Sequence, residues 1–185
     1  MNRKLYLLFL VFAVITVSCK EDYIPKPKAM LRLEYPSSQA DTLVTEKFQF
    51  EYNKMAKITK NRNFAVTLDY PVMKGSIFLT YKKVDNNLEE LLTDAQKLSY
   101  EHVVKADNIM EQPFINEKDL VYGMFYEVLG NAASQAQFYV TDSTNHFVTG
   151  SLYFRAKPNY DSIYPAAVYL QKDIRRIMET LRWKN

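Results

Sequence analysis

The chain has 185 residues, of which 48% are apolar and 24% are charged, and its single Cys, 4 Gly and 7 Pro exclude a disulfide-held, collagen-like or disordered protein. Subtracting Arg3 and Lys4, which lie in a removable N-terminal segment, from the 24 basic residues leaves 22 against 21 acidic residues. That balance gives no indication of nucleic-acid binding.

Residues 1–18 are predicted to be a secretory signal peptide. A basic start, Met1–Lys4, precedes an apolar run from Leu5 to Val17 and a small residue, Ser18. The run is shorter than the roughly 20 apolar residues that span a bilayer. An uncleaved N-terminal anchor is the alternative, but the charged residues 20–22 follow the run directly.

Cys19 is the predicted lipidation site. The segment Thr16-Val17-Ser18-Cys19 resembles the bacterial lipobox, although Thr16 departs from the usual Leu. The alternative is a stray Cys behind an ordinary signal peptide. Several acyl chains on one residue, including palmitate, would give stable membrane anchoring. Residues 20–22, Lys-Glu-Asp, resemble the signal that sends Bacteroidetes lipoproteins to the outer face of the outer membrane. Anchoring in the periplasmic leaflet and anchoring in the surface leaflet are both compatible with this sequence.

Residues 19–28 are predicted to form the lipidated Cys and a Pro/Lys tether, and residues 29–185 a single globular domain. Pro25 and Pro27, without any apolar periodicity, favour an extended backbone of about 3.1 Å per residue in the tether. The domain is therefore expected to stay close to the membrane.

The first part of the domain shows strand-like alternation of apolar and polar residues. It begins at 31–33, recurs at 48–52 and is clearest at 64–70. Lys74-Gly75 is typical of a turn into a further strand at 77–81. These features predict a β-hairpin.

An amphipathic helix is predicted next, because apolar and boundary residues recur at spacings of three and four. Its stripe comprises Leu88, Leu91, Leu92, Ala95, Leu98, His102 and Ala106. Asn87 as N-cap and Glu90 three residues later form a capping-box pattern. Pro113 is predicted to separate this helix from a second β region.

The second β region contains three predicted consecutive strands at 121–128, 136–140 and 147–154. Gly130-Asn131 marks the first turn between them, and residues 142–145 mark the second.

A C-terminal helix is predicted from a second apolar stripe, with Pro165 tolerated in its first turn. The stripe comprises Ile163, Ala167, Leu170, Ile174, Ile177 and Leu181. Basic residues in its C-terminal half suit the helix dipole, namely Lys172, Arg175, Arg176 and Arg182. The order predicts an α+β fold, an antiparallel sheet with covering helices. It resembles the Mog1/PsbP-type α–β–α sandwich, an analogy of fold that implies no shared function.

The sequence predicts no catalytic residues, no cofactor and no metal site. Its only histidines are His102, expected to pack at the core boundary, and His146, and no zinc-ligand spacing occurs. Asp142, Ser143 and His146 contain the residue types of a catalytic triad, but Asp and Ser are also what a turn needs. No phosphate-binding or nucleophile-elbow motif is present.

Five residues on or beside the last helix are candidates for partner contact. Tyr160, Tyr164 and Trp183 flank the helix and could anchor a partner, or could seal the helix onto the sheet. Arg175 and Arg176 lie off its apolar stripe, where a change to Ala is expected to cost less than about 0.5 kcal/mol in stability. Loss of function from such a change would mark a contact surface.

Several stretches together carry a family resemblance, namely 21–27, 50–58, 86–107, 130–144 and 146–154, of which Asn131-Ala132-Ala133-Ser134 running into residues 137–144 is the most specific. They resemble the gliding-motility lipoprotein GldD family of the Bacteroidetes. The resemblance implies a non-enzymatic, lipid-anchored component required for gliding and for type IX protein secretion. Cys19, as the lipidated residue, is the only position to which the resemblance assigns a role.

The leading hypothesis is therefore an assembly or scaffold lipoprotein that contacts other envelope proteins. A lipoprotein binding a lipid, glycan or peptide in a groove between sheet and helices is the first alternative. A cell-wall enzyme is the second, and it would require a buried carboxylate pair with shifted pKa values.

Overall fold

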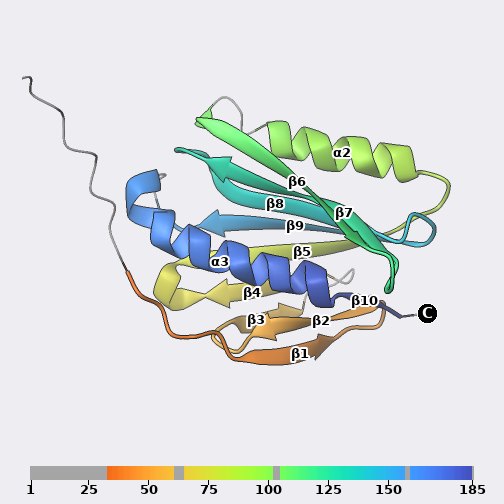
Figure 1. The fold of residues 1–185 in the computed structure, drawn as a ribbon, viewed down its shortest axis with the longest axis horizontal. Coiled ribbons are helices and arrows are strands. Elements are labelled where there is room, and N and C mark those ends of the chain that lie inside the picture. The colour runs from red at the N-terminus through yellow and green to blue at the C-terminus, as the bar shows by residue number, and fades with distance from the viewer. Residues whose placement is uncertain (1–32, 61–64, 102–104, 157–158, 185) are drawn as a thin grey trace, which may run out of the picture.

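The computed structural model describes residues 33–60, 65–101, 105–156 and 159–184. In these ranges the chain forms ten strands, two α-helices and one short 3₁₀ turn (Figure 1). In chain order they are β1 (Ala40–Val44), β2 (Phe48–Asn53), β3 (Lys57–Lys60), β4 (Val66–Tyr70), η1 (Pro71–Met73), β5 (Gly75–Lys83), α2 (Leu88–Tyr100), β6 (Asn108–Asn116), β7 (Val121–Leu129), β8 (Ser134–Thr141), β9 (His146–Phe154), α3 (Tyr160–Thr180) and β10 (Arg182–Trp183).

The strands form two antiparallel sheets. The larger sheet has seven strands in the order β3-β4-β5-β9-β8-β7-β6, and the smaller has three in the order β1-β2-β10. The predicted hairpin is confirmed as β4–β5, with Leu68 opposite Ile77. The predicted three-strand meander is also confirmed, as β7, β8 and β9 paired in succession.

The two helices cover opposite faces of the large sheet. On β9, Val148 packs in the core beneath α3, whereas its neighbour Phe147 packs in a second cluster with Leu91 and Ala95 of α2. Successive side chains of a strand point to opposite faces, so the sheet lies between the helices. The α+β class is confirmed; the likeness to the Mog1/PsbP-type fold stays a prediction.

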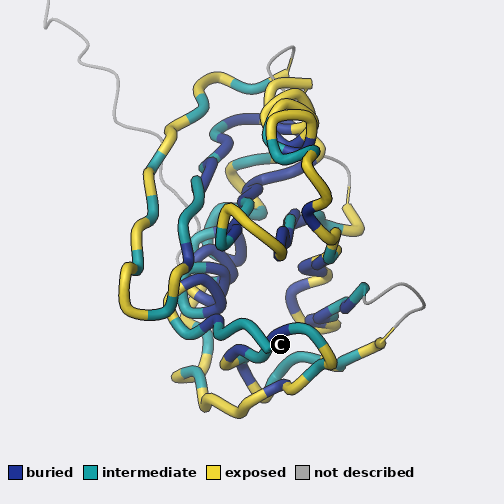
Figure 2. Tube along the Cα trace, turned by 90° about the vertical axis from the view of Figure 1, so that its right-hand side faces the viewer, coloured by how far each residue is buried: buried dark blue, intermediate teal, exposed yellow. Residues whose placement is uncertain are grey.

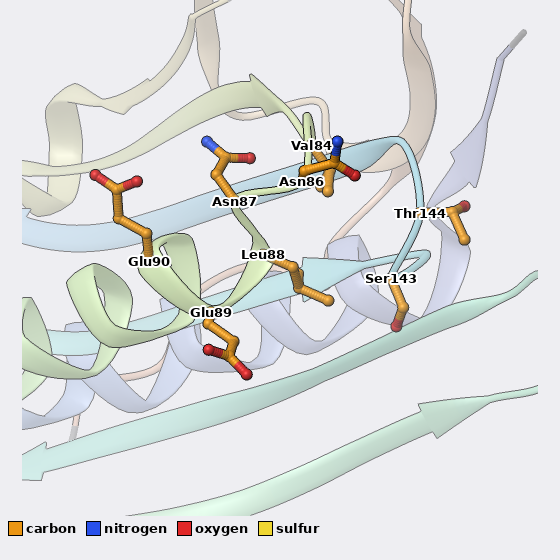
Figure 3. A pocket seen from close by; sticks show the side chains of 8 residues that line it. All are labelled: Val84, Asn86, Asn87, Leu88, Glu89, Glu90, Ser143 and Thr144. Carbon is orange, nitrogen blue, oxygen red and sulfur yellow. The ribbon is translucent and has the colours of Figure 1, made fainter.

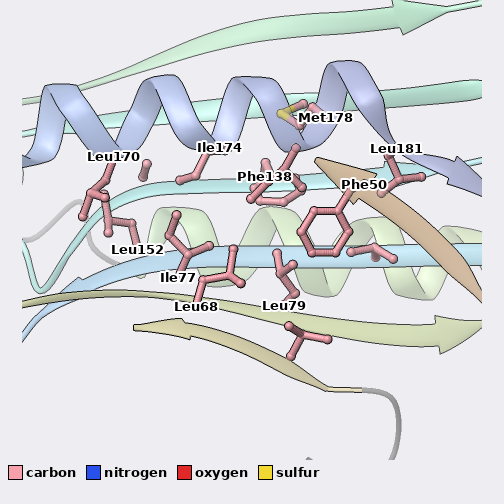
Figure 4. Close-up of a cluster of buried hydrophobic side chains, with 14 of the residues drawn as sticks. Phe50, Leu68, Ile77, Leu79, Phe138, Leu152, Leu170, Ile174, Met178 and Leu181 are labelled. Atoms are coloured by element: carbon pink, nitrogen blue, oxygen red, sulfur yellow. The ribbon is translucent and has the colours of Figure 1, made fainter. Parts of the chain in front are cut away.

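The main core lies between α3 and both sheets. Leu170 and Ile174 of α3, and Leu181 directly after the helix, are fully buried there. They face side chains such as Leu68 and Ile77 of the large sheet (Figure 4). Figure 2 shows that α2 is exposed over most of its surface while much of α3 is buried. The fold therefore depends on α3 far more than on α2.

The helix predicted from Leu88 is shorter than its stripe suggested. α2 ends at Tyr100, so Ala106 lies outside it, and His102 falls outside the described residues. The predicted capping box is wrong, because the Asn87 side chain makes no capping bond. Its Oδ1 accepts instead the backbone N–H of Asp85, 2.8 Å away, and so stabilises the preceding turn.

Pro113 does not separate the helix from the second β region, because it lies within β6 opposite Met124. β6 is an edge strand, where a residue without an N–H group is tolerated. The predicted strand at 31–33 is wrong in its described part, since Leu33 is exposed and has no strand conformation.

Two expectations about the last helix are also corrected. α3 begins at Tyr160, so Pro165 lies in its second turn and removes one internal hydrogen bond. The helix has no basic residue in its last turn, so its dipole does not explain Arg175 and Arg176, because dipole effects fade beyond the last turn.

Candidate functional site

The predicted lipidation site, Cys19, and the tether at 20–28 lie outside the described residues. No described helix combines the length and the apolar character needed to cross a bilayer. The described chain begins at Leu33, and the segment that follows it is the part of the domain nearest to the predicted anchor in sequence.

This entering segment, Tyr35–Ser38, lies along α3. The rings of Tyr35 and Tyr169 are 5.3 Å apart, and the Tyr169 hydroxyl donates a hydrogen bond of 2.8 Å to the carbonyl of Pro36. Further along the helix, Arg176 donates to the Ser38 hydroxyl. The segment Tyr35–Ser38 is therefore fixed to the helix that closes the core.

Asp173 of α3 is a buried carboxyl beneath this segment, with only 3% of its surface exposed. Its Oδ2 accepts a hydrogen bond of 2.9 Å from Nδ2 of Asn53 on β2. Burial raises the pKa of Asp173, against the opposing effects of the Asn53 hydrogen bond and of Arg176. The hydroxyl of Tyr70 lies near enough to influence Asp173 but makes no hydrogen bond of good geometry with any described residue.

We expect Asp173→Asn to stabilise the protein relative to wild type as the pH rises from about 4 towards neutrality. Because the folded state raises this pKa above its ordinary 3.8, folding favours the protonated carboxyl, and the stability it contributes is lost as the pH rises through the raised value. Asn cannot ionise, so it removes that loss.

The measurement is the Tm of variant minus that of wild type between pH 4 and pH 7, with Asp85→Asn on an exposed turn as control. A Tm difference that stays constant across this range would show that folding does not raise the pKa of Asp173.

The five predicted contact residues are not gathered on one surface. Tyr160 and Tyr164 meet edge to face at the start of α3, with ring centroids 5.4 Å apart. Burial, followed by the neighbouring Tyr164, raises the pKa of Tyr160 to about 12. Trp183 lies beyond the other end of α3, a helix of 21 residues and hence about 31 Å long.

Both arginines are engaged within the protein. The Arg175 guanidinium lies 4.4 Å from the centroid of the Phe125 ring, and its Nη2 is 3.9 Å from Oε2 of Glu127. Arg176 contacts Ser38, as described above. Replacing either residue would therefore remove an internal contact, and the small stability cost expected from sequence is revised upwards.

Trp183 and His146 form a stacked pair at the end of the large sheet. Their rings are 5.1 Å apart and nearly parallel, at 8°. His146 Nδ1 is 2.9 Å from the hydroxyl of Tyr81, and burial is the main cause that lowers the His146 pKa. Trp183 therefore packs the end of the small sheet against the large one, whereas the structural alternative from sequence had it seal the last helix onto the sheet.

Asp142, Ser143 and His146 form a turn and no triad. Asp142 Oδ1 accepts the backbone N–H groups of Thr144, Asn145 and His146, at 3.0, 2.8 and 2.8 Å. Burial alone would raise the Asp142 pKa, but these hydrogen bonds lower it. The Asp142 carboxylate thus orders the β8–β9 loop, while the His146 ring bonds the Tyr81 hydroxyl through Nδ1.

Hollows open on the described surface, and two of them bear on function. One, of about 740 Å³, lies at the start of α2 and is lined by Val84, Asn86, Asn87, Leu88, Glu89, Glu90, Ser143 and Thr144 (Figure 3). Its polar side chains point in different directions and do not converge on a common point. The other, of about 360 Å³, lies over Phe78 and the ion pair of Asp69 with Arg155.

Among the described residues, no three His, Cys, Asp or Glu side chains are grouped so that they could hold a metal ion. Polar side chains of α3 such as Asp173, Arg175 and Arg176 instead make contacts within the protein.

A comparison with protein families places most of the chain within a known family model. The family described as gliding motility lipoprotein GldD matches residues 20–183, from the position after the only cysteine almost to the C-terminus. The comparison with curated proteins finds no match.

Proposed function

The chain belongs to the gliding motility lipoprotein GldD family, and on that basis we propose that it is anchored to the outer membrane through Cys19 and serves the gliding machinery as an assembly component. We extend the proposal to type IX protein secretion and to a non-enzymatic role, in which the domain acts by contacting other envelope proteins. The observation that carries it is the family match, which begins directly after the sole cysteine.

The chemistry of the described residues is compatible with this role. The groups with the most suggestive chemistry have structural partners: Asp173 bonds Asn53, Asp142 orders a loop, and His146 pairs with Tyr81. Tyr160 and Tyr164, at the N-terminal end of α3, remain predicted contacts for a protein partner.

Binding of a lipid, glycan or peptide is the second candidate. It would use the hollow at the start of α2 or the one over Phe78. Since the first is open and its polar groups diverge, we rank this candidate below protein contact (Figure 3).

We expect Cys19→Ala to release a folded protein from the membrane. The sole cysteine carries the anchor in this proposal, so the change should abolish incorporation of labelled palmitate and move the protein to the soluble envelope fraction. Fractionation and labelling of cells measure both effects, and gliding should be lost with them. Retention of the variant in the membrane fraction would contradict anchoring at Cys19.

Cross-linking in native outer membranes tests the partner class. Purification of the lipidated protein should then recover gliding and secretion proteins. A Tyr160→Ala, Tyr164→Ala variant should reduce that recovery, with Val72→Ala on the exposed turn between β4 and β5 as a control. Recovery of bulk lipoproteins alone would count against the proposal.

A further inference from the structure

The hairpin that joins β6 to β7 presents two exposed aliphatic side chains at its tip. Ile115 has 70% of its surface exposed and lies near the end of β6. Leu120 has 55% exposed and is the last residue of the turn at 117–120. Isolated exposed apolar residues are ordinary on protein surfaces, so exposure alone assigns no role. The conformation of Leu120 adds a second observation.

Leu120 has a φ of 52°, in the left-handed region that bulky side chains rarely occupy. Its N–H donates to the carbonyl of Glu117 at 3.4 Å and so closes the turn. Gly or Asn would adopt this conformation with less strain. A large aliphatic residue kept where the backbone disfavours it points to a use for its side chain.

The turn is held rigidly against the C-terminal end of the chain. Asp119 forms a 2.7 Å ion pair with Arg182, and its Oδ2 accepts a 2.9 Å hydrogen bond from Asn116. The indole N–H of Trp183 donates to the Leu120 carbonyl at 2.9 Å. The tip and the C-terminus therefore form one fixed feature at the same end of the molecule (Figure 1).

The size of the tip decides between a protein and a lipid occupant. A stable protein interface buries about 800 Å² on each partner, far more than two aliphatic side chains supply. A tethered domain, in contrast, needs only a weak second contact, because its anchor already holds it at the surface. The stretch from Cys19 to Leu33 spans at most about 50 Å, so the bilayer stays within reach of the domain.

We propose that the β6–β7 tip inserts Ile115 and Leu120 into the lipid surface to which the chain is anchored. This rests on the proposed anchoring at Cys19. Aliphatic side chains suit the boundary of the acyl chains, and the amphipathic rings of Trp suit the interface just above it. Anchor and tip together would hold the domain in a fixed orientation on the membrane.

The test uses Trp183, the only Trp of the chain, as a reporter beside the tip. The mature full-length chain is coupled at Cys19 to a maleimide phospholipid and bound to vesicles of phosphatidylethanolamine and phosphatidylglycerol with brominated acyl chains. We expect the bromine atoms to quench Trp183 fluorescence, and the double change Ile115→Ser, Leu120→Gly to abolish most of that quenching. Gly suits the positive φ at position 120, and circular dichroism verifies that the variant is folded.

Val72→Ser is the matched control, because Val72 is 81% exposed on the turn between β4 and β5. Quenching should survive this change. Absence of quenching in the wild type, or quenching unchanged in the double variant, would overturn the proposal. Loss of gliding in the double variant without wild-type quenching would overturn it in favour of a protein partner. Chemical coupling makes these results independent of lipidation in cells, which the palmitate experiment tests separately.

Discussion

Leu170→Ala is expected to lower the free energy of unfolding by about 2–5 kcal/mol. Leu170 is fully buried at the centre of α3. Its side chain occupies space left by Gly75 on β5, where a Cβ atom would lie only 2.6 Å from Leu170 Cδ1. Truncation would leave a cavity between helix and sheet that rigid strands cannot fill. Urea denaturation monitored by circular dichroism measures the change.

Lys172→Ala is the matched control on the same helix, because Lys172 is exposed and should change stability by less than about 0.5 kcal/mol. Arg175 is less suitable, since its guanidinium lies over Phe125. If Leu170→Ala were as mild as the control, α3 would not close the sheet, and the layered arrangement described above would be wrong.

The long elements could be predicted because each buries one face over many residues. β2, the β4–β5 hairpin, the strands β7 to β9 and the apolar stripe of α3 all have a clear period. β1, β3 and β10 bury at most one side chain each, so their pairing partners, not their own sequences, fix them. β6 was not predicted, because Pro113 suggests a break in secondary structure. A proline is tolerated there only because β6 lies at the edge of the sheet.

The candidate sites were less predictable, because they depend on distant contacts. Asp173 lies on the apolar stripe, three residues after Leu170 and four before Ile177, and this position was the one available signal of its burial. The strain at Leu120 follows from the turn geometry, and the contact of Arg176 with Ser38 joins residues 138 positions apart. Sequence spacing contains no information about such contacts.

Gly150→Ala is expected to destabilise the protein by about 1–3 kcal/mol or more through overpacking. Gly150 lies opposite Phe138 in the β8–β9 ladder, and the buried Phe138 ring covers it. A Cβ atom at position 150 would overlap Cε1 of that ring and lie 2.8 Å from its Cδ1. Since Phe138 is itself packed beneath α3, the ring cannot move aside without disturbing the main core.

The cause can be separated from a general intolerance of β9 by a double-mutant cycle with Phe138→Leu. A smaller side chain at 138 creates room for the new methyl group, so the double variant should lose less stability than the sum of the two single changes, by about 0.5–3 kcal/mol. Thr149→Ala, at the adjacent and partly exposed position, supplies the control in the same strand. Strict additivity of the two core changes would mean that the ring does not limit position 150, and that another contact requires the glycine.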